Sequence, residues 1–240
     1  MRGKPLQTMD HAAAGTIPPL GVIMLDTAFE RPPGDVGNAA SWPFPVQYRT
    51  VSGATARKVV GGDDADLLDA FAAAGEALQK QGAVALITSC GFLAARQPVL
   101  ASRMSLPLAT SSLLQIPVIA SLLPKGRTVG VITYDAASLG PAHFAGVGAD
   151  PATPVMGLPQ AGAFRGLIEG GAAYDAPALQ AELEAVAERL IAEHPSTGAL
   201  LLECTNLPPF SSALRQRFGL PVFDILTLGR WLYQAACGQI

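Results

Sequence analysis

The sequence predicts an α/β protein with two pseudosymmetric lobes, each a parallel sheet flanked by helices, with a candidate site in the cleft between them. Two observations predict this fold. Short, wholly apolar segments alternate with amphipathic ones, as in parallel sheets covered by helices. The same order of segments then occurs a second time, which indicates an internal duplication.

The first half of the chain shows this alternation clearly. Three strands are expected there, over 20–25, 46–51 and 83–88. The segment 64–82 has the pattern of an amphipathic helix, because Asp63 or Asp64 can cap its start and Gly82 can end it. After Pro107, we expect a helix capped by Ser111 or Ser112 and kinked or interrupted at Pro117.

The second half repeats the pattern. Apolar strands are expected over 128–133 and 199–203, and a helix is expected over 175–194 between them. Asp175 can cap this helix, and Pro177 suits its first turn. The predicted division of the chain is an N-terminal tail (1–19), a first lobe (20–124), a second lobe (125–225) and a C-terminal helix (226–240) that packs back on the first lobe.

One cysteine follows an apolar strand in each half. Cys90 follows 83–88 and Cys204 follows 199–203. A Leu-Pro pair then comes at the same distance, since Pro107 lies 17 residues after Cys90 and Pro221 lies 17 residues after Cys204. Ligands of parallel sheets bind beyond the carboxyl ends of the strands. We therefore expect the two thiols to meet across one cleft.

Composition and motifs exclude several classes of function. Half of the residues are hydrophobic, the net charge is −3 and the basic residues are scattered, which disfavours nucleic acid as a partner. The apolar stretch 106–124 is interrupted by prolines, so no membrane association is expected. Three cysteines form no disulfide framework, and we expect a cytoplasmic protein. No nucleotide motif, metal-ligand spacing or activated lysine is evident, so no cofactor is expected.

Facing thiols suit acid–base chemistry at a carbon atom. One group can remove a proton from one face while the other returns a proton to the opposite face. Gly91 would let the backbone approach closely at Cys90. Thr205 and Asn206 could donate hydrogen bonds to a substrate carboxylate.

The segments "TSCGF" and "ECTNLP", together with the repeat, resemble the aspartate/glutamate racemase superfamily, which includes hydantoin racemases, arylmalonate decarboxylases and maleate isomerases. The resemblance implies a cofactor-independent mechanism in which Cys90 and Cys204 flank the substrate carbon. It also implies a role for Asp26 at the end of the first strand, and for the Thr133-Tyr134 pair in holding a carboxylate.

The motifs also depart from the pattern of glutamate racemases. The residues after Cys90 are Gly91 and Phe92, where those enzymes tend to have Asn-Thr, and Cys204 is followed by Thr205-Asn206 in place of Thr-His. We therefore expect a racemase or epimerase acting next to a carboxylate, on an amino acid such as aspartate. The alternatives are a maleate-isomerase-like or decarboxylase-like enzyme and a non-catalytic carboxylate-binding relative.

The candidate site combines two catalytic cysteines with residues that would bind substrate. The long Pro- and Gly-rich loop over 26–45 either closes over the substrate or forms a rigid surface. The expected ligand is a small carboxylate, and a homodimer is an open alternative. The predicted substrate-binding residues are Asp26, Arg31, Asn38, Ser89, Gly91, Thr133, Tyr134, Thr205 and Asn206.

Overall fold

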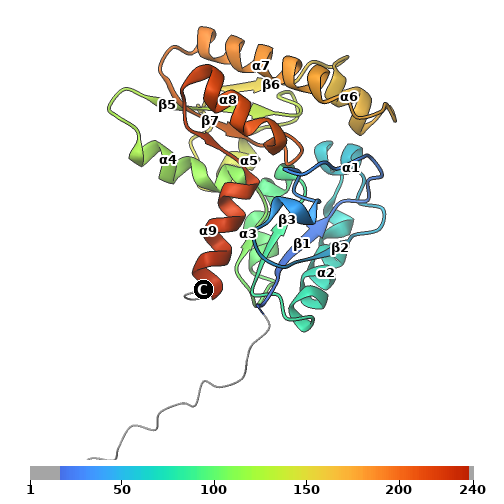
Figure 1. Cartoon of the computed structure of the whole chain (residues 1–240). Coiled ribbons are helices and arrows are strands. Elements are labelled where there is room, and N and C mark those ends of the chain that lie inside the picture. Colours follow the sequence, from blue (N-terminus) through green and yellow to red (C-terminus); the bar gives the residue numbers. More distant parts are fainter. Residues whose placement is uncertain (1–16, 238–240) are drawn as a thin grey trace, which may run out of the picture.

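The computed structural model describes residues 17–237, which form two α/β lobes (Figure 1). Each lobe contains one four-stranded sheet, and every strand pair in it is parallel. The strand orders are β2-β1-β3-β4 and β6-β5-β7-β8, so the two sheets have the same topology. The predicted two-lobed α/β fold is confirmed.

The first lobe holds the elements from β1 to α4. Its strands are β1 (Leu20–Met24), β2 (Val46–Thr50), β3 (Ala85–Thr88) and β4 (Leu108–Ala109). Its α-helices are α1 (Ala56–Val60), α2 (Leu68–Lys80), α3 (Gln97–Ala101) and α4 (Ile116–Leu122). Its 3₁₀ helices are η1 (Ala39–Ser41), η2 (Ala65–Leu67), η3 (Gly91–Arg96) and η4 (Ser112–Gln115).

The second lobe follows the same plan. Its strands are β5 (Thr128–Thr133), β6 (Val155–Gly157), β7 (Thr197–Leu202) and β8 (Val222–Phe223). Its helices are α5 (Pro141–Gly146), α6 (Ala163–Ile168), α7 (Ala176–Glu193), η5 (Pro208–Phe210) and α8 (Ser211–Phe218), and α9 (Ile225–Cys237) follows.

The central strands form where the sequence is continuously apolar. Every residue of β1 and β3 is buried, which is the pattern of strands covered on both faces. The edge strands β4, β6 and β8 have only two or three residues each. Runs this short show no hydrophobic period, so the sequence did not indicate them.

Two predicted helix starts have different outcomes. Asp175 caps α7 as predicted, because its side chain accepts a hydrogen bond from the Ala178 N–H. The helix predicted over 64–82 begins with the 3₁₀ turn η2 and continues as α2. Asp64 makes no capping bond there, because its carboxylate binds the guanidinium of Arg96 at 2.6 Å instead.

The segment after Pro107 is interrupted near Pro117 as predicted. Ser111 caps the 3₁₀ turn η4 by accepting a hydrogen bond from the Leu113 N–H. A new helix, α4, begins at Ile116 and holds Pro117 in its first turn, where a missing N–H costs nothing.

The C-terminal helix α9 packs against the first sheet, although it follows the second one in sequence (Figure 1). Tyr233 is fully buried, its ring stacks on Phe44, and its hydroxyl donates to the Pro18 carbonyl at 2.6 Å. Residues 238–240 of the predicted helix and 1–16 of the predicted tail lie outside the described residues.

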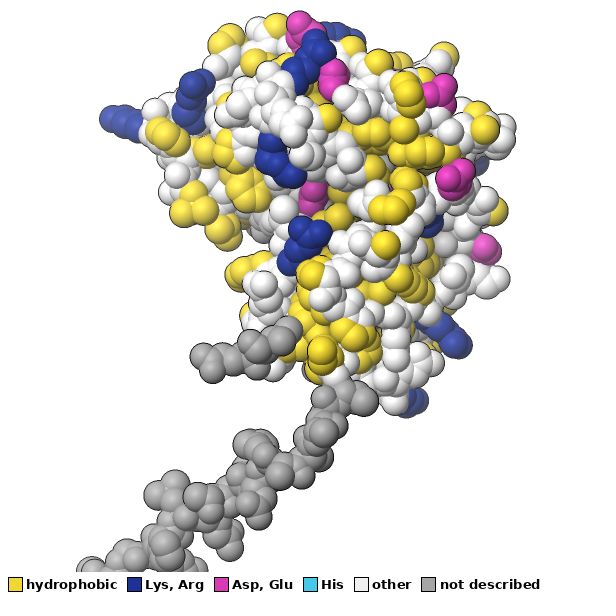
Figure 2. All heavy atoms as spheres, viewed as in Figure 1, with side chains coloured by type: hydrophobic (Ala, Val, Ile, Leu, Met, Phe, Trp, Pro, Cys, Tyr) yellow, Lys and Arg dark blue, Asp and Glu magenta, His cyan; other side chains and the backbone are white. Residues whose placement is uncertain are grey.

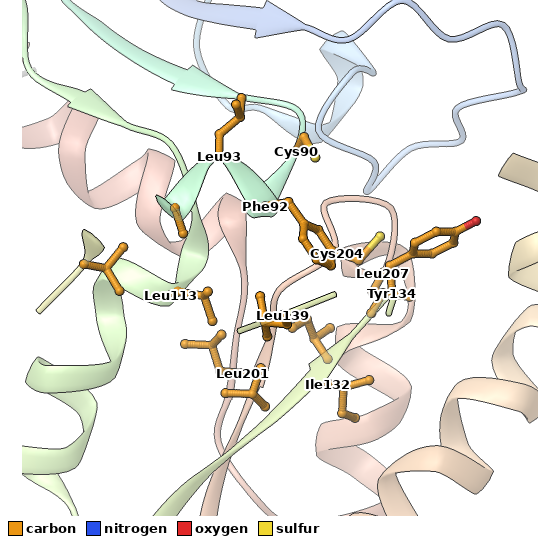
Figure 3. Close-up of a cluster of buried hydrophobic side chains, with 14 of the residues drawn as sticks. Cys90, Phe92, Leu93, Leu113, Ile132, Tyr134, Leu139, Leu201, Cys204 and Leu207 are labelled. Atoms are coloured by element: carbon orange, nitrogen blue, oxygen red, sulfur yellow. The ribbon is translucent and has the colours of Figure 1, made fainter. Parts of the chain in front are cut away.

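One hydrophobic core joins the two lobes. Leu93 and Leu113 of the first lobe belong to the same buried cluster as Ile132 and Leu201 of the second (Figure 3). Next to this cluster, η3 packs against α5, and the Phe92 ring meets the His143 ring edge-on at 5.4 Å. The lobes are therefore held by apolar packing beside the strand ends.

Charged side chains are sparse on the surface. On the face shown in Figure 2, basic and acidic side chains meet at the top of the view, and the others lie apart among apolar and neutral ones. None of the helices within residues 17–237 combines the length and the apolar character that crossing a bilayer would require.

The shared core predicts the effect of a truncation in β7. Leu201→Ala should lower the free energy of unfolding by about 2–5 kcal/mol, because Leu201 is fully buried and the variant leaves a cavity. Leu122→Ala is the matched control, since Leu122 is 73% exposed and should change stability by no more than about 0.5 kcal/mol. Urea denaturation measures both, and equal losses would contradict this account of the core.

Candidate functional site

Both cysteines of the repeat line one cavity. Cys90 is the second residue after β3 and Cys204 is the second residue after β7, so each lies at the carboxyl end of a central strand. Each is 8% exposed and belongs to the cavity wall. In Figure 3, Cys90 enters from the first lobe and Cys204 from the second, and the Phe92 ring lies beside Cys204.

Equivalent hydrogen bonds hold the two strand ends. The Ser89 N–H donates to the Ile23 carbonyl at 3.0 Å, and the Glu203 N–H donates to the Ile132 carbonyl at 2.8 Å. The Leu25 N–H then donates to the Ser89 hydroxyl at 2.8 Å. In the second lobe, the Tyr134 N–H makes a longer bond of 3.4 Å to the Glu203 carboxylate. Ser89 and Glu203 therefore occupy equivalent positions, each directly before a cysteine.

The cavity between the lobes is small. It encloses about 30 Å³, which suits one or two water molecules. Its wall combines apolar side chains with a few polar groups, as small-molecule sites do. The predicted site residues in this wall are Arg31, Ser89, Cys90, Gly91, Tyr134, Cys204, Thr205 and Asn206.

Thr205 and Asn206 connect the second lobe to the first. The Thr205 hydroxyl donates to the Ser89 carbonyl at 2.7 Å, and the Asn206 amide donates to the Asp35 carboxylate at 2.7 Å. The Asn206 side-chain oxygen also accepts from the Cys204 thiol at 3.6 Å. These contacts fix the turn after β7 and orient the Cys204 sulfur.

The loop over 26–45 forms an ordered wall built around a buried carboxylate. Asp35 is 1% exposed and binds the Arg31 guanidinium at 2.8 Å. Arg31 also donates to the Thr27 hydroxyl at 2.7 Å and lies over the Phe29 ring at 4.3 Å. A positive group is thereby held at the cavity wall in a rigid setting.

Three of the predicted binding residues lie outside the cavity wall. Asp26 is exposed and accepts a hydrogen bond from the Gly53 N–H. Asn38 caps η1 and donates to the Arg31 carbonyl. Thr133 is fully buried, and its hydroxyl donates to the Glu203 carboxylate at 2.8 Å. These three side chains hold loops and neighbouring groups instead of facing the cavity.

Tyr134 lines the cavity with its ring turned toward a polar cluster. Its hydroxyl donates to Glu169 at 2.6 Å, and the Arg165 guanidinium lies over the ring at 4.1 Å. Burial, followed by this bond to Glu169, raises the pKa of the Tyr134 hydroxyl. The phenol is therefore neutral at physiological pH and serves as part of the wall.

Glu203 is a site residue that sequence reasoning missed. Its side chain is fully buried in the cavity wall, and a Cβ atom at position 91 would overlap both its carboxyl oxygen and its main-chain oxygen. Burial raises the pKa of this carboxyl to about 7, although the Thr133 hydroxyl and the Tyr134 N–H lower it. The available signal was an acidic residue at the end of the apolar run "ALLLE".

The environment keeps both thiols protonated. Burial and then the Glu203 charge raise the pKa of Cys90, while the N–H groups of Phe92 and Leu93 partly oppose the rise. The same two causes raise the pKa of Cys204 well above its usual value, and the Asn206 N–H opposes them. A thiolate here therefore requires a positive charge in the cavity or a proton acceptor beside the sulfur.

Comparisons of sequence with known proteins identify lyases. The chain is 34% identical over 215 residues to a dimethylsulfoniopropionate lyase of Durusdinium sp. clade D, covering 86% of this chain and 71% of that protein. It is 32% identical over 221 residues to dimethylsulfoniopropionate lyase 3 of Emiliania huxleyi, covering 88% of this chain and 57% of that protein. No protein-family model matches the chain.

Comparisons of structure confirm the fold of the aspartate/glutamate racemase superfamily. A glycine-to-cysteine variant of arylmalonate decarboxylase in a sulfate-associated form aligns with a TM-score of 0.65 at 20% identity, covering 92% of this chain and 94% of that one. An aspartate racemase homologue from Pyrococcus horikoshii aligns with a TM-score of 0.53 at 11% identity, covering 92% of this chain and all (100%) of that one.

The prediction of an amino-acid racemase, and hence of an isomerase, is wrong. The sequence relatives are lyases, whereas the racemases are similar only in fold. Two thiols at facing strand ends indicate proton transfer at a carbon. They do not indicate whether the carbon then regains a proton or a neighbouring bond breaks. At 34% identity to a relative of which it covers 71%, the chain belongs to the family of dimethylsulfoniopropionate lyases.

Proposed function

We propose that the protein is a lyase that cleaves dimethylsulfoniopropionate into dimethyl sulfide and acrylate. The observation that carries this proposal is the 34% identity to a lyase of that name, spread over 86% of the chain. The cavity supports it, because two thiols, which can serve as a base, and a guanidinium, which can bind a carboxylate, line the same space between the lobes.

The reaction begins as racemisation does, with loss of a proton from the carbon next to a carboxylate. In dimethylsulfoniopropionate, the neighbouring carbon carries a sulfonium group. When a base takes the α-proton, the C–H electrons form a C=C bond and the C–S electrons leave with neutral dimethyl sulfide. Cys90 and Cys204 are the candidates for the base, since both line the cavity.

The substrate's own charge favours the thiolate. Burial and Glu203 raise the pKa of both thiols. A sulfonium is a full positive charge, and in a water-poor cavity an opposite charge stabilises a nearby anion. Binding of the substrate would thus lower the pKa of the adjacent thiol when a base is needed.

The cysteines can be tested one at a time. An elimination needs a base on only one face of the carbon, so we expect one of Cys90→Ser and Cys204→Ser to lower kcat for dimethyl sulfide release by about 10²–10⁴-fold. Gas chromatography of dimethyl sulfide and chromatography of acrylate measure the products. Cys237→Ser is the matched control, because Cys237 lies on α9 away from the cavity wall. Unchanged kcat in both cavity variants would exclude the thiols as the base.

Arg31 provides a test of carboxylate binding. Its guanidinium lines the cavity and is oriented by Asp35 and Thr27, so it can also bind the substrate carboxylate. Arg31→Met should raise KM by about 10–100-fold, because a charged hydrogen bond contributes about 1.5–3 kcal/mol. Arg96→Met is the matched control, since Arg96 also pairs with a buried aspartate but lies outside the cavity wall. Steady-state kinetics would count against this role if both variants shifted KM equally.

A further inference from the structure

Glu203 breaks the pseudosymmetry of the site. Its equivalent in the first lobe is Ser89, which is held by the same pattern of hydrogen bonds from the adjacent strand. The two cysteines are repeated between the lobes, but the acidic group is present in only one of them. A symmetric proton exchange would need no such difference, so the carboxyl requires its own explanation.

The carboxyl is in contact with both thiol-bearing turns. It belongs to the residue directly before Cys204, and it packs against Gly91, which directly follows Cys90. One oxygen accepts from the Thr133 hydroxyl at 2.8 Å. The other, Oε1, is buried without a hydrogen-bond partner among residues 17–237. A buried, unpartnered oxygen at this position is available to take a proton from a thiol.

The chemistry of the proposed function creates a need for such an acceptor. A racemase returns a proton to its substrate, so the number of protons on the enzyme is the same before and after each turnover. Elimination from the zwitterion dimethylsulfoniopropionate yields neutral dimethyl sulfide, the acrylate anion and one proton. That proton is left on the base thiol, and each candidate thiol has little contact with solvent, since Cys90 and Cys204 are both 8% exposed.

We propose that Glu203 is the proton acceptor that regenerates the thiolate after each elimination. This inference rests on the proposed lyase function. After the elimination, the Glu203 carboxyl first releases its proton to water. The S–H bond of the base cysteine then breaks and an O–H bond forms on the Glu203 carboxylate, which leaves the thiolate for the next turnover. One negative charge moves between neighbouring groups, so the buried site never holds two. Glu203 acts through the thiol and does not touch the substrate. It is therefore a positioning residue, which controls whether the thiol carries its proton.

The carboxyl is suited to this exchange at neutral pH. Its pKa of about 7 lets it release a proton to water near neutral pH, and the carboxylate can take the thiol proton when a sulfonium in the cavity lowers the pKa of the thiol. Below this pKa it is protonated and cannot accept, so kcat of the wild-type enzyme should rise as the pH increases through about 7.

The test is the pH dependence of kcat for Glu203→Gln, which keeps the shape of the side chain and removes the acceptor. We expect this variant to lose the rise near pH 7 and to turn over about 10²-fold more slowly at pH 8. Thr133→Val should move the rise to higher pH, because the Thr133 hydroxyl lowers the pKa of Glu203. This second variant keeps the inference testable if Glu203→Gln does not fold.

The matched control is Asp224→Asn. Asp224 is also a buried carboxyl with a raised pKa, but it bonds to Ser211 and Thr227 and lies outside the cavity wall. Its variant should keep the wild-type pH profile. The inference would be overturned if kcat of Glu203→Gln had the same pH dependence as kcat of the wild-type enzyme. It would also be overturned if the rise in kcat of Thr133→Val stayed at the wild-type pH.

A measurement without substrate separates this inference from the proposed function. Alkylation of the cavity thiols by iodoacetamide, in a Cys237→Ser background, should show a lower apparent thiol pKa in Glu203→Gln, because the Glu203 charge raises the pKa of both thiols. Absence of that shift overturns the inference even if the wild-type enzyme cleaves dimethylsulfoniopropionate. A shift together with a retained rise near pH 7 overturns the acceptor role. Inactivity of the wild-type enzyme overturns the proposed function. The alkylation shift would then still report that the Glu203 charge raises the pKa of the two thiols.

Discussion

Gly91 and Glu203 pack directly against each other where strands from the two lobes end, and the geometry of the site follows from this contact. Any side chain at position 91 would overlap Glu203 and push the turn after β3 away from the turn after β7. The hydrogen bond from Thr205 to the Ser89 carbonyl joins the same two turns. Together these contacts place both thiols in one cavity, and the apolar core beneath them keeps the lobes together.

Proteins that share this fold are named for different reactions. Structural neighbours include an arylmalonate decarboxylase and an aspartate racemase homologue, while the sequence relatives are lyases. Removal of a proton next to a carboxylate leaves an electron pair, which can accept a proton again or expel a leaving group on the next carbon. The substituents of the substrate and the charged groups around it decide between these outcomes. This is why two cysteines alone led to the wrong reaction.

The polar groups of the site differ between the lobes although the backbone repeats. The first lobe provides Ser89 and a loop that holds Arg31 against a buried Asp35. The second lobe provides Glu203 and the Asn206 amide, which reaches back to Asp35. The cavity therefore presents a positive group from one lobe and an ionisable acid from the other. This arrangement would suit the zwitterionic substrate of the proposed function.

The sequence predicted those features that depend on neighbours along the chain. Continuous apolar runs indicated the central strands, and Asp175 followed by Pro177 indicated the start of α7. The edge strands β4, β6 and β8 were missed because two or three residues carry no period. Asp64 was expected to cap a helix, but Arg96, distant in sequence, provides its partner instead.

By itself, the sequence determined the repeated α/β lobes and the placement of one cysteine after a central strand in each, since strand periodicity and the turn that ends a strand are local properties. Only the tertiary structure decided which polar residues face the cavity. It turned Thr133 away from the cavity and toward Glu203, and it buried Glu203 against Gly91. The pKa of that carboxyl depends on burial by residues from both lobes, and burial of this kind arises from contacts between segments that are far apart in the chain.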